Sequence, residues 1–229
     1  MPFENNIIID NTIEDAWRSV IWCCVRNGKD YVVEGGSYIG QIRRQLPYVV
    51  IDIRQPWTRP LAPRMPEGCG IPPTTTDEKI IDYFVNYIFG TEKSENEDYT
   101  YGQFINPQVN QCIRILNESN GNSNQSCITI GDGNSISLQS PPCLKVITFK
   151  VIEGKLQMSV VFRSWDLYAG FPENLGGLQI LKEYVLSQLE FEVEDGNLVA
   201  YSDGLHLYEQ YFGLVNVLSI DKIYNKGGI

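Results

Sequence analysis

Apolar side chains recur every three or four positions in four segments of the chain, the spacing that buries one face of a helix. In the first segment, residues 11–25, Thr12 is placed to cap the start and Asn27-Gly28 to end it. The apolar stripe of that segment consists of Ile13, Trp17, Val20, Ile21 and Cys24. Residues 77–89, 108–116 and 175–189 repeat the pattern and predict three further helices.

Runs rich in β-branched residues predict the strands. Residues 144–151 and 156–163 are two such runs, and Glu153-Gly154-Lys155 between them is typical of a hairpin turn. Shorter runs predict strands at 48–53, 198–202 and 214–220. Helices and strands are mixed along the chain without an internal repeat or a linker, so we expect one α/β domain over residues 1–229.

Two polar segments separate these elements. Residues 55–76 are rich in Pro, Gly and Thr, and arginines follow one another through this region at 54, 59 and 64. Long ordered loops in compact domains often carry function, so this loop is of interest. Residues 117–126 are rich in Asn, Ser and Gly and predict a surface turn.

Composition narrows the classes of partner. The net charge of −10 over 229 residues argues against a broad basic face for nucleic acid, but a local positive pocket can still bind a small anion. No apolar run approaches the roughly 18 residues of a membrane span, and residues 1–10 lack the basic start of a signal peptide. We therefore expect a cytoplasmic protein with six reduced cysteines; a single histidine and no Cys-x-x-Cys pair disfavour a metal site.

Groups of distinct chemistry gather between residues 141 and 208. Cys143 follows two prolines at the entrance to a predicted strand, a rigid position for a thiol nucleophile. Arg163-Ser164 ends the paired strand and offers the guanidinium and hydroxyl expected around a phosphate. The hairpin would bring Cys143 and Arg163 together if its register allows. Taken singly, a buried structural cysteine and a surface salt bridge are the commoner roles.

Four further side chains suit a nucleotide. Asn174 offers a donor and an acceptor to a pyrimidine edge, although an amide at this point also caps helices. Asp166 can accept from backbone amides or from a ring nitrogen. His206 and Tyr208 alternate along an extended segment, so both point the same way, toward a sugar hydroxyl or into a hydrogen-bonded core.

In its order and spacing, this set resembles the signature of the thymidylate synthase family. The matching pieces are Pro142-Cys143, Arg163-Ser164-Trp165-Asp166, Gly170-Phe171-Pro172-Glu173-Asn174 and His206-Leu207-Tyr208. Upstream, Tyr99-Thr100-Tyr101-Gly102 looks like the Tyr-Gly segment of the family's short archaeal-type branch. The resemblance spans residues 99–208, and residues 1–98 match only loosely.

The resemblance implies C5 methylation of deoxyuridylate with methylenetetrahydrofolate as co-substrate and without a metal. Cys143 would add to C6 of the pyrimidine, and Arg163 and Ser164 would hold the phosphate. Tyr101 would belong to a proton-transfer network, and Asp166 would order the base. Further roles are implied for Asn174, which would read the uracil edge, and for His206 and Tyr208, which would bind the sugar 3′-hydroxyl. The implied fold is a mixed, strongly bent sheet with helices on one face, in a homodimer whose two sheets pack together.

Departures from the family pattern leave two other functions open. Ser123-Asn124-Gln125 stands where the family has a double arginine that binds the phosphate. Residues 130–134 lack the tryptophan that the family has there. Glu34 is a candidate for the family's upstream catalytic glutamate. The candidates to replace the double arginine are Arg43, Arg44, Arg54, Arg59 and Arg64. One alternative is a hydroxymethylase acting on dUMP, dCMP or CMP, with water in place of hydride in the last step. The other is a non-catalytic nucleotide-binding protein.

Overall fold

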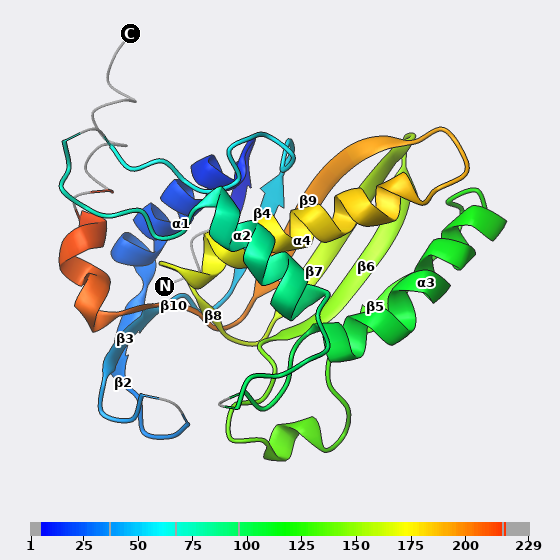
Figure 1. Cartoon of the computed structure of the whole chain (residues 1–229). Coiled ribbons are helices and arrows are strands. Elements are labelled where there is room, and N and C mark those ends of the chain that lie inside the picture. Colours follow the sequence, from blue (N-terminus) through cyan, green and yellow to red (C-terminus); the bar gives the residue numbers. More distant parts are fainter. Residues whose placement is uncertain (1–5, 37, 67, 96, 217, 219–229) are drawn as a thin grey trace, which may run out of the picture.

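A six-stranded mixed sheet forms the centre of the protein (Figure 1). The computed structural model describes residues 6–36, 38–66, 68–95, 97–216 and 218. The strands lie in the order β1 (Ile7–Asp10), β4 (Val49–Ile53), β9 (Glu194–Ser202), β7 (Lys155–Phe162), β6 (Leu144–Ile152) and β5 (Cys127–Thr129). The β1–β4 and β7–β9 pairs are parallel, and the remaining neighbours are antiparallel.

A smaller four-stranded sheet carries part of the candidate site. Its strands lie in the order β2 (Lys29–Val32), β3 (Ile42–Gln45), β10 (Leu205–Tyr208) and β8 (Trp165–Asp166). The β8–β10 pair is parallel and joins Asp166 to His206 in register. Two motifs that are far apart in the sequence therefore become neighbours.

The long helices cover one face of the larger sheet (Figure 1). Helix α1 (Ile13–Asn27) packs against β1 and β4, α3 (Gly102–Glu118) against β5, and α4 (Gly170–Ser187) against β7 and β9. Helix α2 (Asp77–Tyr83) continues into a π-helical turn, η1 (Phe84–Ile88), and both lie on α4. One hydrophobic core fills the space between, which confirms the mixed α/β fold with helices on one face.

Helix α1 agrees closely with the sequence pattern. The Thr12 hydroxyl accepts a hydrogen bond from the amide of Asp15, whose carboxylate accepts from Thr12 in return, a capping box. The Gly28 amide donates to the carbonyl of Cys24 at the other end. All five residues of the expected stripe are buried.

Helix α3 begins at Gly102, well before the expected start at residue 108. Pro107 lies inside this helix, although proline has no amide hydrogen to donate there. The apolar spacing nevertheless continues through it, since the buried residues are Gly102, Ile105, Val109, Cys112 and Leu116. Burial of this stripe outweighs the single lost hydrogen bond.

The strand expected at residues 214–220 is wrong where the structure describes it. Residues 212–216 and 218 are helical, and the rest of the segment lies outside the described residues. Val215 and Leu218 are both buried, three positions apart, as on one helical face. A short apolar run fits either element, and packing decides between them.

The hairpin of β6 and β7 forms as expected and contains a bulge near Cys143. Glu153 and Gly154 make the two-residue turn with φ angles of 52° and 74°, the left-handed geometry of a tight hairpin. The pairing shifts by one between Leu144 and Val146, so an additional residue sits on β6 there. Such bulges redirect side chains at the end of a strand.

In the part of the chain that the structure describes, no helix has both the length and the hydropathy needed to cross a bilayer.

Candidate active site

Cys143 and Arg163 lie side by side at the open end of the β6–β7 hairpin. The Arg163 amide donates to the Cys143 carbonyl at 2.9 Å, and the guanidinium Nη2 lies 3.9 Å from the thiol Sγ. The same guanidinium donates to the carbonyls of Pro141 and Pro142. The register thus brings together the two groups that the sequence singled out, and it holds the arginine through the backbone of the two prolines.

Three cations surround the thiol in a chain that is acidic overall. Burial raises the pKa of Cys143 above its ordinary value, while the positive charges of Arg163, Arg43 and Lys145 oppose that shift. Positive groups near a thiol favour the thiolate, which is the nucleophilic form. Positive charge is therefore concentrated locally around Cys143, although the chain as a whole is acidic.

A group of tyrosines borders Cys143 on the side of α3. The Tyr101 hydroxyl accepts a hydrogen bond from the amide of Leu144 at 3.2 Å, directly after the cysteine. Its ring lies 5.7 Å from Tyr99 and 5.1 Å from Tyr87, and the hydroxyl of Tyr99 interacts with those of Tyr87 and Tyr101. Burial raises the pKa of all three phenols, so they stay protonated at neutral pH and can act as donors.

Asn174, just after the first turn of α4, is bound at both ends of its amide. The Trp165 indole Nε1 donates to Oδ1 at 3.0 Å, and Nδ2 donates to the Tyr83 hydroxyl at 2.8 Å. Asn174 is half-buried, so part of the amide remains accessible. Tyr83 stacks on Tyr87 at 5.4 Å, which connects the amide to the tyrosines beside Cys143.

The Asp166 carboxylate organises the turn that leads into α4. Its oxygens accept hydrogen bonds from the amides of Tyr168, Ala169 and Gly170 at 3.1–3.3 Å. Of the two roles that the sequence left open, these contacts match the bonding of backbone amides. Asp166 holds in place the turn before the helix that carries Asn174.

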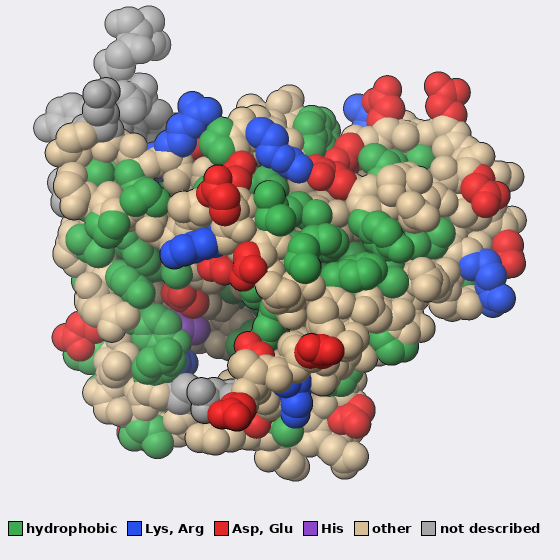
Figure 2. Space-filling view, in the orientation of Figure 1, with side chains coloured by type: hydrophobic (Ala, Val, Ile, Leu, Met, Phe, Trp, Pro, Cys, Tyr) green, Lys and Arg blue, Asp and Glu red, His purple; other side chains and the backbone are tan. Residues whose placement is uncertain are grey.

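His206 and Tyr208 point the same way from β10, as their spacing predicts. Their rings meet edge to face at 4.9 Å, and Arg43 Nη2 donates to the Tyr208 hydroxyl at 3.2 Å. Burial raises the pKa of Tyr208 to about 12. The imidazole, the only purple group in Figure 2, is visible at the back of a hollow in the surface.

The tautomer of His206 follows from its contacts. Nδ1 lies 2.8 Å from the carbonyl of Gly204, which only accepts, so Nδ1 carries the proton. Nε2 is buried and has no hydrogen-bond partner among the described residues. A buried polar atom without a partner is costly, so this lone pair is suited to a hydroxyl group of a ligand.

The pKa of His206 is expected to lie below the ordinary value of 6.5, because burial disfavours the charged imidazolium. The positive charge of Arg43 lowers this pKa further, while the hydrogen bond to the Gly204 carbonyl raises it. A lowered folded-state pKa means that the unfolded chain binds more protons, so stability falls as pH drops below about 6.5. The chain has one histidine, so its ring resonance can be followed by NMR from pH 8 to pH 5. A midpoint at or above the value measured in urea would contradict this electrostatic picture.

Of the five arginines proposed to replace the double arginine, Arg43 is the one in contact with the site. Arg44 pairs with Asp30 at 2.7 Å and Arg59 with Glu183 at 2.7 Å, both away from Cys143. Arg54 is exposed, and Arg64 lies on the long loop. The sequence alone did not favour Arg43 over the other four arginines. The structure distinguishes it, because Arg43 lies opposite Tyr208 in the β3–β10 pairing.

The remaining candidates from the sequence make fewer contacts with the groups around Cys143. Ser164 is half-buried next to Arg163 and packs against Gly204. Glu34 is exposed on the loop between β2 and β3, and Ser123-Asn124-Gln125 lies on the turn before β5. Lys145 and Tyr83 were not singled out, because their roles depend on the bulge in β6 and on the packing of α2 against α4.

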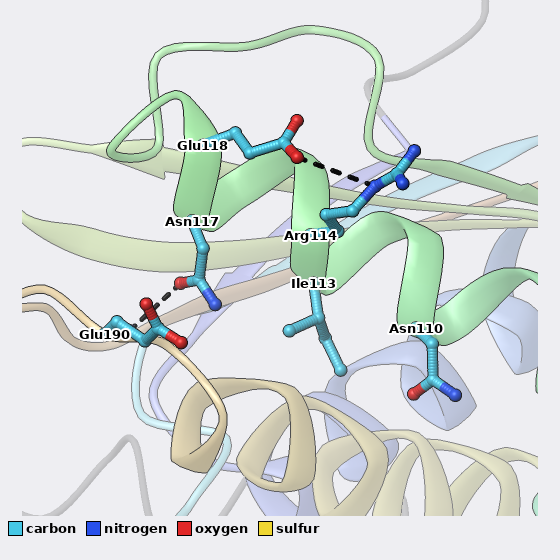
Figure 3. Close-up of a pocket in the computed structure, with 6 residues that line it drawn as sticks. All are labelled: Asn110, Ile113, Arg114, Asn117, Glu118 and Glu190. Carbon is cyan, nitrogen blue, oxygen red and sulfur yellow. Dashed lines mark hydrogen bonds and ion pairs between the residues drawn. The ribbon is translucent and has the colours of Figure 1, made fainter.

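A second hollow, of about 430 Å³, lies between α3 and the loop after α4 (Figure 3). Its lining residues are Asn110, Ile113, Arg114, Asn117, Glu118 and Glu190. Their polar groups largely bind one another: Arg114 pairs with Glu118 at 3.7 Å, and Asn117 Oδ1 accepts from the Glu190 amide at 3.0 Å. None of them is a predicted site residue, so the chemistry points to the hairpin end instead.

Comparisons with known proteins place the chain as a whole. The sequence profile described as "Thymidylate synthase" matches residues 83–222, more than half of the chain. Proteins described as "Putative thymidylate synthase" from Methanosarcina acetivorans and Methanothermobacter thermautotrophicus are 29% and 24% identical, over 91% and 88% of this chain and 92% and 93% of theirs. The fold is similar to that of thymidylate synthase A from Bacillus subtilis, with a TM-score of 0.67 at 14% identity, over 91% of this chain and 84% of that one. The chain belongs to the thymidylate synthase family.

Proposed function

We propose that the protein methylates deoxyuridylate at C5, using methylenetetrahydrofolate and a covalent bond from Cys143 to the pyrimidine. The observation that carries the proposal is the thiol of Cys143 placed 3.9 Å from the Arg163 guanidinium and beside the hydroxyls of Tyr99 and Tyr101. A nucleophile, cations and proton donors are the groups that this addition requires.

Different residues would bind the phosphate, the sugar and the base of the nucleotide. Arg163, Arg43 and Ser164 supply charge-assisted and neutral donors for the phosphate. The bare Nε2 of His206 accepts from the sugar 3′-hydroxyl, with Tyr208 beside it. The amide of Asn174 meets the O4 and N3–H edge of uracil, and Asp166 fixes the turn in front of it.

The chemistry begins with the Cys143 thiolate, whose sulfur forms a bond to C6 while the C5–C6 π electrons move onto C5 and O4. C5 then forms a bond to the one-carbon unit and loses its proton, which the hydrogen-bonded hydroxyls of Tyr99 and Tyr101 are placed to relay. The S–C6 bond then breaks, which expels the Cys143 thiolate in the reverse of the first step and restores the C5–C6 double bond. Methylenetetrahydrofolate, when bound, supplies the carbon and the hydride. The half-buried ring of Tyr87 near the thiol offers a flat face that fits a pterin.

Release of tritium from C5-labelled deoxyuridylate in the presence of methylenetetrahydrofolate tests the proposal directly. We expect release above the no-folate control, with a product heavier by one methyl group. A hydroxymethyl product would instead support the hydroxymethylase, which the lack of a tryptophan in residues 130–134 keeps open. Binding of the nucleotide without any release would indicate the non-catalytic alternative.

The outer face of the six-stranded sheet suits a homodimer. Strand pairing aligns Ile7, Val50, Tyr201, Val161 and Val146 in one apolar row on the face away from the helices. In this row Ile7 is 53% exposed and Tyr201 is 38% exposed. Such exposure is unusual for large apolar side chains that lie together on one face of a sheet. Packing of two such faces would bury the row.

We expect Tyr201→Lys to weaken the dimer by roughly 100-fold or more, because each chain would bury a charge in place of apolar contacts. Light scattering over a dilution series measures the dissociation. Tyr31→Lys is the matched control, since Tyr31 is similarly exposed, at 40%, on β2 of the other sheet. A wild-type protein that is monomeric at all concentrations would contradict the dimer.

A further inference from the structure

We propose that Trp165 determines the choice of uracil over cytosine by fixing the orientation of the Asn174 amide. The proposal rests on the function above, because it assumes that Asn174 meets a pyrimidine base. It adds a residue that does not touch the base: Trp165 is a positioning residue that acts through Asn174.

The argument begins with the hydrogen-bond inventory of the two partners of Asn174. An indole N–H is a donor only, so the atom of the amide that faces Trp165 Nε1 at 3.0 Å must be the oxygen. A flipped amide would set two donors against each other in a buried place. The Tyr83 hydroxyl, 2.8 Å from Nδ2, can donate or accept and would tolerate either orientation. Trp165 alone therefore decides which way the amide lies.

The indole that makes this contact is held rigidly. Its ring stacks between Phe162, at 4.1 Å and 8°, and Phe171, at 4.7 Å and 23°, and the side chain is 1% exposed. Strand β8 fixes its backbone against Leu205 of β10. The donor cannot follow the amide if the amide rotates, so a flip leaves the indole N–H without a partner.

Space beside Asn174 is also left free. A Cβ added at Gly170 would lie 3.6 Å from Asn174 Oδ1 and 3.2 Å from the Asp166 Cβ. With glycine there, no side chain covers that flank of the amide oxygen. Each amide atom uses one bond within the protein and keeps one more: a lone pair on Oδ1 and a hydrogen on Nδ2.

The free lone pair on Oδ1 and the free hydrogen on Nδ2 match uracil and not cytosine. Uracil presents N3–H, a donor, next to O4, an acceptor, and so it needs an acceptor and a donor in the order that the fixed amide offers. Cytosine presents N3, an acceptor, next to the N4 amino donor, the reverse order. Cytosine could be bound well only by the flipped amide, which Trp165 excludes.

Direct binding of dUMP and dCMP, measured by calorimetry without folate, tests the proposal. Wild-type protein is expected to prefer dUMP. Trp165→Phe keeps a ring between Phe162 and Phe171 but removes the N–H, and the ratio of the dCMP and dUMP dissociation constants should fall by about tenfold, or ~1.4 kcal/mol. Tyr83→Phe should weaken both nucleotides while leaving the ratio unchanged.

Trp22→Phe on α1 makes the same chemical change far from Asn174 and should alter neither constant. If Trp165→Phe fails to fold, 3-benzothienylalanine at position 165 keeps the indole shape without the N–H and gives the same test. A Trp165→Phe protein that loses affinity for both nucleotides equally, with the ratio intact, would overturn the proposal while leaving the proposed function standing. Wild-type protein that binds neither nucleotide would overturn both.

Discussion

Serine in place of Cys143 is expected to lower tritium release from C5-labelled deoxyuridylate by a factor on the order of 10³ or more. A serine hydroxyl has nearly the size of the thiol, so the hairpin end and its contacts with Arg163 should persist. Its oxygen is hardly ionised at neutral pH, and no other group replaces the thiolate as the atom that bonds C6. Activity is measured with excess methylenetetrahydrofolate, and nucleotide binding is measured separately.

Cys127→Ser is the matched control for this experiment. Cys127 is an exposed free cysteine on β5, two strands from β7 in the same sheet, so its loss should leave the rate unchanged. Intact folding of Cys143→Ser is checked by its dUMP affinity, which should stay within a few-fold of the wild type. Persistent tritium release by Cys143→Ser would remove the thiol from the mechanism.

Methionine in place of Lys182 is expected to lower the free energy of unfolding by about 3–5 kcal/mol. The Lys182 side chain is fully buried, and its Nζ lies 2.7 Å from Asp195 Oδ1 and also donates to the Gly196 carbonyl. Methionine fills a similar volume but carries no charge, so among the described residues it leaves the Asp195 carboxylate, 15% exposed, with the neutral donor Gln179. Urea denaturation with an unchanged m-value measures the loss.

Lys155→Met is the control, because Lys155 pairs with the neighbouring Glu194 at 3.8 Å with both side chains more than half exposed. Its loss should change the free energy of unfolding by no more than about 0.5 kcal/mol. Adding Asp195→Asn to Lys182→Met removes the stranded charge and should recover at least about 1 kcal/mol. Equal losses in the Lys182 and Lys155 variants would contradict a buried ion pair.

Sequence reasoning succeeded where local geometry leaves little choice. The two-residue turn at Glu153-Gly154 sets which residues of the hairpin face each other, so the proximity of Cys143 and Arg163 could be anticipated. The alternation of a strand likewise placed His206 and Tyr208 on one side. Both inferences depend on periods of two residues within one short element.

Prediction failed where distant packing decides. Residues 214–216 and 218 are helical because Val215 and Leu218 join the core, and the apolar run alone fits either element. Arg43 could not be chosen over four other arginines until β3 paired with β10. The Asn174 amide is held by Tyr83 from α2 and Trp165 from β8, and the indole is held in turn by two phenylalanines. No spacing in the sequence predicts these contacts.

The bulge between Leu144 and Val146 limits how this hairpin can change in length. Along most of β6 and β7 the partners run from Ile152↔Lys155 to Val146↔Val161, and the bulge shifts the last pair to Leu144↔Phe162. Inserting or deleting one residue in either strand would move the guanidinium away from the thiol, or turn it to the opposite face. Viable length changes must therefore come in matched pairs, one residue in each strand. The separation of 20 positions between Cys143 and Arg163 therefore determines whether the thiol and the guanidinium meet.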